Sequence, residues 1–172
     1  NLNLKQNPID RCYHCKKELY LQLFEIASKY GIQNIIDGTN YDDTMDYRPG
    51  RKAAYELNIK SPLQDTKITK EEIREIAQIL MLPNFDKPST PCLASRFPYG
   101  TYITKEGLKQ VYEAEKYIKS FGFRSVRVRY HGPLARIEVE KEKISDISKE
   151  NIRNDISDYL KKLGFVWVCI DL

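Results

Sequence analysis

The sequence predicts an α/β half-domain followed by a small α+β domain, and two observations carry this prediction. Residues 34–37 are a short apolar strand candidate that runs into a polar, glycine-containing loop and then a helix. Such a unit binds ligands beyond the carboxyl ends of its strands. From Thr104 onward the pattern becomes helix, two alternating strands, helix and strand, which is typical of an α+β domain. We therefore expect domains over residues 1–86 and 104–172, joined by a linker over 87–103.

The composition indicates a globular protein. Hydrophobic residues make up 41% of the 172 residues, and the net charge of +4 is mixed in sign along the chain. So mild a charge does not require a nucleic-acid partner and is compatible with an anionic small molecule. Without an apolar run of membrane length or a signal peptide, we expect a cytoplasmic protein with no membrane partner. Because the chain starts at Asn1 rather than at methionine, we expect it to be the C-terminal part of a longer protein.

In the first domain, residues 7–16 lead into a helix of about twenty residues that Gly31 is placed to end. Its apolar residues recur at helical spacing: Leu19, Leu23, Phe24, Ala27 and Tyr30. Residues 59–63 are a second strand candidate, which Pro62 restricts to a sheet edge. A further helix is expected from Thr69 to about Leu82, because Thr69 and Glu72 have the spacing of a capping box and Pro83 follows.

The second domain is expected to contain a helix over 104–122, two strands, a charged helix over 143–163 and a strand over 165–170. In the first strand Val126 and Val128 share one face while Arg127 and Arg129 share the other. The second strand follows the same alternation, with Ala135, Ile137 and Val139 on the core side and Arg136, Glu138 and Glu140 opposite. Paired guanidinium groups suit phosphate or carboxylate recognition. The alternative is a solvated face with cross-strand ion pairs.

The loop over residues 87–100 presents a single thiol. Pro88, Pro91 and Pro98 exclude a helix interior or a central strand. Cys92 is followed by Ser95 and Arg96, and a neighbouring cation lowers a cysteine pKa and so populates the thiolate. This pattern suits sulfur chemistry on an anionic substrate. The alternative is a domain linker with a buried cysteine.

The other cysteines are interpreted differently. Cys12 and Cys15 form a CxxC pair, which indicates half of a zinc site, part of an iron–sulfur site together with Cys92, or a redox dithiol. Cys169 lies in an apolar strand and is expected in the core. The loop GTNYDD allows close approach of a nucleotide, although an ordinary βα loop is the simpler interpretation. Glu115 is likewise more typical of a surface residue than of a site carboxylate.

Several motifs together resemble the ATP-dependent sacrificial sulfur transferases, the LarE family of the PP-loop pyrophosphatase superfamily. They are NPIDRCYHCK, DGTNYDD, DYRPGRKAAYEL, SPL, TKEEIRE and KPSTPCLASRFPYGTYIT, and the resemblance is strongest from about Asn7 to Thr104. It implies that residues 1–86 are the C-terminal part of a PP-loop domain, a Rossmann-type fold like the adenine nucleotide alpha hydrolases. The family's SGGxDS loop does not occur in this sequence, so we do not expect these residues alone to hydrolyse ATP.

The resemblance implies an enzyme of nickel-pincer nucleotide synthesis, which serves lactate racemase maturation. ATP, with Mg²⁺, adenylylates the carboxylates of pyridinium-3,5-biscarboxylic acid mononucleotide, and sulfur transfer then makes thiocarboxylates. In single-cysteine members the loop cysteine, here Cys92, gives up its own sulfur. Members with three cysteines are thought to hold a 4Fe-4S cluster that carries the sulfide, and Cys12, Cys15 and Cys92 match this second type.

The resemblance also implies binding residues and partners. Ser95, Arg127 and Arg129 would hold the substrate phosphate or the acyl-adenylate. Glu115 and the loop residues Gly38, Thr39, Asn40 and Asp43 would face the metal or the nucleotide. The expected partners are the pyridinium mononucleotide, ATP, a sulfide donor and further copies of the chain through residues 104–172.

Two alternatives remain from other classes. One is a cluster-dependent tRNA thiolase of the same superfamily, against which the modest charge and the lack of a long basic-aromatic surface argue. The other is a zinc-stabilised module without catalysis, held by Cys12, Cys15, Cys92 and a histidine.

Overall fold

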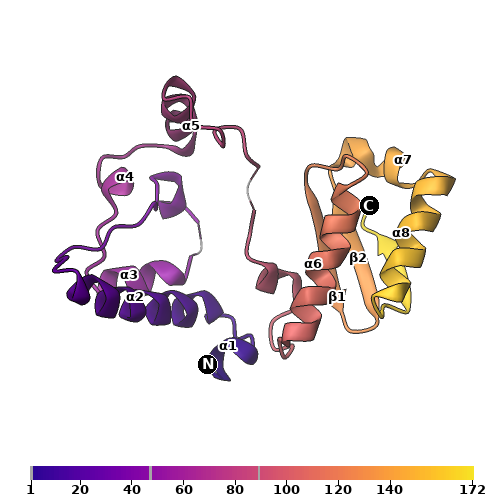
Figure 1. Cartoon of the computed structure of the whole chain (residues 1–172), viewed down its shortest axis with the longest axis horizontal. Coiled ribbons are helices and arrows are strands. Elements are labelled where there is room, and N and C mark those ends of the chain that lie inside the picture. Colours follow the sequence, from indigo (N-terminus) through magenta and orange to yellow (C-terminus); the bar gives the residue numbers. More distant parts are fainter. Residues whose placement is uncertain (1, 47, 89) are drawn as a thin grey trace. The chain divides into compact units, whose positions relative to one another are not determined.

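The computed structural model describes residues 2–46, 48–88 and 90–172. Tyr47 and Ser89, which belong to motifs quoted above, lie outside the described residues. The contacts divide the chain into two compact units (Figure 1). We call Pro8–Lys87 the N-terminal unit, and Pro88–Leu172 with the residues up to Asn7 the C-terminal unit. The division into domains 1–86 and 104–172 with a linker over 87–103 stays a prediction.

The N-terminal unit is built on α2 (Arg11–Lys29), which packs against α3 (Gly50–Glu56). Tyr20, Ala53, Ala54 and Ile59 form its small buried core. Gly31 ends α2 as predicted: at φ +66° its amide donates to Ser28 O, and the Ile32 amide donates to Ala27 O at 2.9 Å. This pair of bonds is a Schellman motif, which satisfies the last carbonyls of the helix.

The two predicted strands of this unit are reduced to a single parallel bridge between Ile36 and Lys60. The Asp37 amide donates to Lys60 O at 2.9 Å, and the Lys60 amide donates to Ile35 O at 3.0 Å. The prediction of strands over 34–37 and 59–63 is therefore wrong in extent. Pairing stops because Pro62, which has no amide donor, starts α4 (Pro62–Asp65) immediately after Ser61.

The last helix of the unit, α5 (Lys70–Ile79), confirms the predicted capping box. Thr69 Oγ1 accepts from the Glu72 amide, and Glu72 Oε2 accepts from the Thr69 amide at 2.8 Å. The helix ends three residues earlier than predicted, because Met81 adopts φ +53°. None of its side chains is buried within the unit, and Ile76 and Ile79 are exposed.

The C-terminal unit has a mixed three-stranded sheet in the order β1-β2-β3. β1 (Val126–His131) and β2 (Leu134–Val139) form an antiparallel hairpin in which Val128 faces Ile137. β3 (Trp167–Ile170) lies parallel to β2. A parallel pair requires a crossover connection, and α7 (Ile144–Ile147) and α8 (Glu150–Lys162) supply it. The chain is thus a mixed α/β protein.

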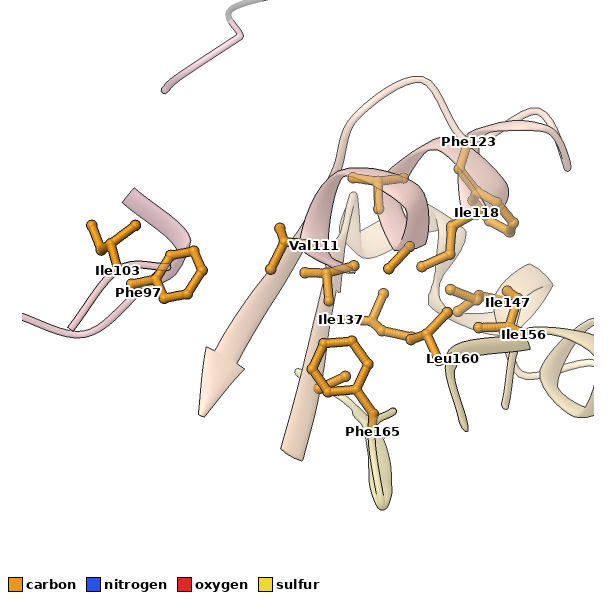
Figure 2. Packing of buried hydrophobic residues seen from close by; sticks show 14 residues of the cluster. Phe97, Ile103, Val111, Ile118, Phe123, Ile137, Ile147, Ile156, Leu160 and Phe165 are labelled. Atoms are coloured by element: carbon orange, nitrogen blue, oxygen red, sulfur yellow. The ribbon is translucent and has the colours of Figure 1, made fainter. Parts of the chain in front are cut away.

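The core of this unit lies between the sheet and the two longer helices, α6 (Lys105–Lys119) and α8 (Figure 2). Val126, Val128, Ala135 and Ile137 are buried, which confirms the predicted core face of the hairpin, whereas Val139 is only partly buried. The helices and the segment between α8 and β3 add further buried residues: Val111, Ala114, Ile118, Ile147, Ile156, Leu160 and Phe165.

Two sequence expectations fail in this unit. The helix predicted over 143–163 is two helices, because Lys149 is extended at ψ 138° and the Ser148 hydroxyl donates back to Ile144 O. Cys169 is exposed rather than in the core. It lies on an edge strand of which only Val168 and Ile170 face the core, so alternation turns Cys169 away.

The connecting segments complete the unit. The short helix α1 (Leu2–Lys5) leads to Asn7, whose buried amide donates to Phe97 O and Pro98 O at 3.2 and 2.7 Å. Two 3-10 turns, Leu93–Arg96 and Lys141–Lys143, flank the α6 and β1-β2 region; a third, Asp42–Thr44, lies in the N-terminal unit. Among the described residues, no helix combines the length and apolar character that crossing a membrane requires.

The hairpin core predicts a large loss of stability on truncation. Ile137→Ala should lower the free energy of unfolding of the C-terminal unit by roughly 2–5 kcal/mol, because Ile137 is 1% exposed and its removal leaves a cavity. Chemical denaturation followed by the fluorescence of Trp167, the single tryptophan, measures this change. Val166→Ala, at a position that is 56% exposed, is the control and should leave stability almost unchanged.

Candidate functional site

The loop that carries Cys92 is fixed in shape but leaves the thiol accessible. Cys92 directly precedes the 3-10 turn Leu93–Arg96, and its carbonyl accepts from the Ser95 amide at 2.9 Å. The thiol is free and exposed, so the alternative of a buried linker cysteine is wrong. An exposed thiol on a rigid loop can reach a substrate.

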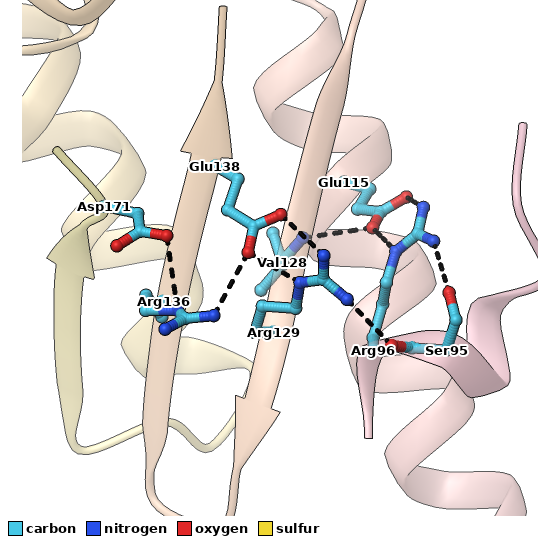
Figure 3. Close-up of polar contacts among 8 residues, drawn as sticks. All are labelled: Ser95, Arg96, Glu115, Val128, Arg129, Arg136, Glu138 and Asp171. Atoms are coloured by element: carbon cyan, nitrogen blue, oxygen red, sulfur yellow. Dashed lines mark hydrogen bonds and ion pairs between the residues drawn. The ribbon is translucent and has the colours of Figure 1, made fainter. Parts of the chain in front are cut away.

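A buried ion pair anchors this loop to the rest of the C-terminal unit (Figure 3). Arg96 is 3% exposed and Glu115 is 5% exposed. Arg96 Nε lies 2.6 Å from Glu115 Oε1 and Nη2 lies 3.2 Å from Oε2. Glu115 Oε1 also accepts from the Val128 amide at 3.0 Å. The expectation that Glu115 is a surface residue is wrong, because α6 turns it toward the arginine of the loop.

Arg96 also organises the polar groups close to the thiol. Its Nη1 lies 3.0 Å from Ser95 Oγ and 3.3 Å from Pro91 O. Because Glu115 already balances its charge, Arg96 mainly anchors the loop and is not a free cation beside Cys92.

The arginines of the sheet face are not equivalent. Arg129 forms a two-pronged pair with Glu138, with Nε–Oε1 at 2.7 Å and Nη2–Oε2 at 2.8 Å, and its Nη1 donates to Ser95 O. Arg136 reaches Glu138 at 3.1 Å and Asp171 at 3.7 Å. Ion pairs therefore occupy both arginines. The pair of Arg129 with Glu138 joins β1 to β2, as the alternative interpretation of this face expected, whereas Arg136 pairs with Glu138 of its own strand and with Asp171 after β3.

These pairs shift the ionisation of both partners. The hydrogen bond to Glu138 raises the pKa of Arg129, and it outweighs the partial burial that would lower it. Burial opposes ionisation of Glu138, but the bond from Arg129 and the nearby arginines hold its pKa below the ordinary value. By contrast, Arg127 makes no hydrogen bond or ion pair within the described residues.

In the N-terminal unit, Asp37 organises the ends of the two bridged segments. Its carboxylate accepts from Ser61 Oγ and Tyr20 Oη, both at 2.8 Å, and from the Thr39 amide at 3.1 Å. Lys16 Nζ lies 3.3 Å away. Burial opposes ionisation, but the bonds from Ser61, Thr39 and Tyr20 outweigh it and hold the pKa of Asp37 well below its usual range. Sequence reasoning gave Asp37 no role, although it directly precedes the GTN loop.

The predicted nucleotide loop closes on itself through side chains. The Asn40 amide donates to Asp43 Oδ2 and the Asp43 amide donates to Asn40 Oδ1, both at 3.1 Å. Asp43 Oδ1 also pairs with Arg48 at 2.8 Å. Gly38 has open space where a Cβ would lie. These contacts order the loop, but they do not test its assignment to a nucleotide.

A cavity of about 500 Å³ opens at the carboxyl ends of the bridged segments, where Thr39 and Ser61 follow Asp37 and Lys60. Carboxyl ends of parallel strands are where α/β units bind ligands. Three cations and one carboxylate lie among its lining residues: Thr39, Arg51, Lys52, Ala54, Tyr55, Asn58, Ile59, Lys60, Ser61, Gln64 and Asp65. Of the four predicted loop residues only Thr39 lines it, and the cavity suits an anionic ligand.

The three predicted cluster ligands belong to two units. Cys12 and Cys15 lie on the first two turns of α2 and are exposed, with His14 paired to Asp10 at 3.2 Å. Cys92 belongs to the C-terminal unit. Within the described residues no group of three or more His, Cys, Asp or Glu side chains is arranged to hold a metal ion. Joint ligation by these cysteines therefore stays a prediction.

Comparison with known proteins finds three relatives that are similar in sequence to nearly the whole chain. No protein-family model matches the chain. An uncharacterized protein of Synechocystis sp. is 45% identical over 172 residues, which are 100% of this chain and 64% of the relative. The pyridinium-3,5-bisthiocarboxylic acid mononucleotide synthase of Lactiplantibacillus plantarum is 41% identical over 170 residues, 99% of this chain and 61% of that enzyme.

The third relative is an uncharacterized protein of Methanocaldococcus jannaschii, 40% identical over 181 residues, which cover 100% of this chain and 69% of the relative. The chain therefore spans between three fifths and seven tenths of the length of these relatives.

The state of Asp37 predicts a pH dependence. Because its folded pKa is depressed, its contribution to stability is complete above the unfolded pKa of about 4 and is lost as pH falls toward the folded value. Asp37→Asn should therefore weaken hydrogen-exchange protection of α2 and α3 at pH 7, and the difference from wild type should shrink below about pH 4. Asp65→Asn is the control. A difference that does not change with pH would contradict the assignment.

The buried pair predicts a strong effect of a single substitution. Glu115→Gln should destabilise the C-terminal unit by roughly 3 kcal/mol, because it leaves the Arg96 charge buried without its counter-ion. Trp167 fluorescence during denaturation measures this. Glu113→Gln, on the same helix but only half-buried, is the matched control, and an equal effect of the two substitutions would argue against the anchoring role.

Proposed function

We propose that this chain is part of an ATP-dependent sulfur transferase. The chain belongs to the protein family that includes the Methanocaldococcus jannaschii relative. Its likeness to the Lactiplantibacillus plantarum synthase supports the LarE family. The proposed reaction converts the carboxylates of pyridinium-3,5-biscarboxylic acid mononucleotide to thiocarboxylates, for nickel-pincer nucleotide synthesis. The observation that carries the proposal is the exposed Cys92 thiol on a loop fixed by the buried Arg96–Glu115 pair.

The proposed chemistry has two stages. ATP transfers its adenylyl group to a substrate carboxylate and releases pyrophosphate, with Mg²⁺ as counter-ion. A sulfur nucleophile then attacks the acyl carbon, the carbon–oxygen bond to AMP breaks, and AMP leaves with the electron pair. If Cys92 is the nucleophile, loss of its Cα proton and cleavage of its Cβ–S bond release the thiocarboxylate and leave dehydroalanine.

The three exposed thiols also fit the other source of sulfur. Cys12, Cys15 and Cys92 are exposed, and thiolates are the ligands that iron–sulfur clusters take. They would hold a 4Fe-4S cluster, which would supply a transferable sulfide and be reloaded by a sulfide donor. This arrangement spares the Cys92 sulfur, so the protein turns over rather than being consumed.

The remaining predicted site residues are assigned to the nucleotide, the substrate or the metal. We assign Gly38, Thr39, Asn40 and Asp43 to the nucleotide, because Thr39 lines the cationic cavity that an anionic ligand suits. Ser95, Arg127 and Arg129 are assigned to the substrate phosphate or the acyl-adenylate. Glu115 is assigned to the metal or nucleotide, although here its oxygens accept from Arg96 and Val128. Assembly into a homo-oligomer and a PP-loop fold for the N-terminal unit belong to the same proposal.

The alternatives receive less support. The one relative with a functional name is named for the synthesis of a small mononucleotide, which favours a small-molecule product over a tRNA thiolase or a zinc-stabilised module. ATP hydrolysis is expected only from protein that includes an SGGxDS loop, which these residues lack.

The cluster assignment predicts the metal content of full-length protein purified without oxygen. Wild type should contain about four iron and four acid-labile sulfide per chain, and Cys12→Ser should lose most of both. Cys169→Ser is the control, because Cys169 is exposed but not a proposed ligand. Full iron content in Cys12→Ser would contradict the assignment. Little iron in wild type, with dehydroalanine at Cys92 after turnover, would instead identify Cys92 as the sulfur donor.

A further inference from the structure

The carboxylate of Asp37 joins the lining of the cavity in the N-terminal unit to α2. One of its oxygens, Oδ1, accepts from the Thr39 amide at 3.1 Å and from Ser61 Oγ at 2.8 Å. Both of these residues line the cavity. The other oxygen, Oδ2, accepts from Tyr20 Oη at 2.8 Å and from Lys16 Nζ at 3.3 Å, and both of these donors come from α2. The helix therefore holds two residues of the cavity from behind.

Lys16 is the cation of this network. Its side chain is 39% exposed, whereas that of Asp37 is 14% exposed. Burial would lower the pKa of Lys16, but hydrogen bonding and charge interactions with Tyr20 and Asp37 outweigh it and raise that pKa above its ordinary value. Lys16 is therefore an ammonium ion at neutral pH. It balances the charge of the carboxylate that holds the two cavity residues.

Gly50 leaves the room that the Lys16 side chain needs. It is buried at the start of α3, which packs against α2. A Cβ at this position would lie 3.0 Å from Lys16 Cδ, 3.3 Å from Lys16 Cγ and 3.3 Å from Cys12 O. Carbon atoms pack best at about 3.5–4.0 Å, so a larger residue would displace the lysine stem or move α3 away from α2. Either movement would disturb the contact of Lys16 with Asp37.

Lys16 does not itself belong to the cavity wall. None of the described residues that line the cavity comes from α2. The contact between Lys16 and the cavity runs instead through Asp37, which bonds to Thr39 and Ser61. This arrangement is that of a residue that fixes a binding surface without touching the ligand. Donors that are fixed before a ligand arrives reduce the ordering cost of binding.

We propose that Lys16 is a positioning residue for this cavity. It acts through Asp37 to hold Thr39 and Ser61 in the lining, and Gly50 gives its side chain the space to do so. The inference rests on the proposed function, in which the loop that contributes Thr39 to the cavity binds the nucleotide. It adds residues behind the cavity wall that affect nucleotide binding without contacting the nucleotide.

The test is a double-mutant cycle on the full-length protein, with the affinity for ATP in the presence of Mg²⁺ measured by calorimetry. Lys16→Met keeps the side-chain stem but removes the ammonium group, and it should weaken ATP binding roughly fivefold. Asp37→Asn should weaken it at least as much. Because Lys16 acts through Asp37, the double variant should bind ATP like Asp37→Asn alone. Additive losses, or unchanged affinity in Lys16→Met, would overturn the proposal.

Gly50→Ala tests the same link by displacement. It should weaken ATP binding in the wild-type background but have little further effect in the Lys16→Ala background, where the stem that meets the new Cβ is absent. Equal losses in the two backgrounds would overturn the role of Gly50. Lys29→Met is the matched control, because Lys29 is an exposed lysine in the last turn of α2. It should leave ATP affinity unchanged, and thermal melts check that every variant is folded.

A spectroscopic measurement separates this inference from the proposed function. In ¹H–¹⁵N spectra of the full-length protein without ligand, the Thr39 amide resonance should shift in Lys16→Met, because its acceptor on Asp37 loses a partner. It should stay in place in Lys29→Met, and a general loss of stability would not single out this amide. If ATP does not bind wild type, the proposed function fails, while a Thr39 shift still supports the positioning role. A Thr39 resonance that does not move in Lys16→Met would overturn that role.

Discussion

The buried ion pair between Arg96 and Glu115 is the interaction on which the candidate site depends. One arginine joins the Cys92 loop to α6, and through the shared Glu115 oxygen it joins β1 as well. A charge so deeply buried is tolerated only with its partner in place. The loop, whose prolines already limit its backbone, is therefore held in one conformation while Cys92 itself stays in solvent. Rigid support and an accessible thiol are what a sulfur-transfer site needs.

Ion pairs also hold the charged face of the sheet in the C-terminal unit. Arg129 and Arg136 are engaged with Glu138 and Asp171 and stabilise the sheet face. Arg127 lies opposite Glu138 in the hairpin register and adds to the positive charge that lowers the pKa of that carboxyl. In the N-terminal unit, Asp37 fixes the ends of two segments through Ser61, Tyr20 and Thr39. The cavity next to it is lined by more cations than carboxylates. In both units, charged side chains whose hydrogen bonds are satisfied by nearby residues position the backbone.

Local signals in the sequence predicted local structure well. The capping box at Thr69, the Gly31 helix end and the core face of the β1–β2 hairpin are confirmed, because each depends on neighbouring residues or on simple alternation. The predictions that failed concern residues whose burial or pairing depends on a distant part of the chain. Cys169 is exposed because its strand is at an edge, Glu115 is buried because a distant arginine reaches it, and the 34–37 segment has only one bridge. Alternation cannot reveal these long-range partners.

The most direct test of the account is the product made by full-length protein with ATP, Mg²⁺ and pyridinium-3,5-biscarboxylic acid mononucleotide. Mass spectrometry should find substrate carboxylates in which sulfur has replaced one oxygen, formed only when ATP is present and lost in Cys92→Ala. Adenylylated substrate that accumulates in that variant would show that activation precedes sulfur transfer, as the account requires. Unchanged mononucleotide with wild-type protein, or thiocarboxylate formed equally well by Cys92→Ala, would contradict it.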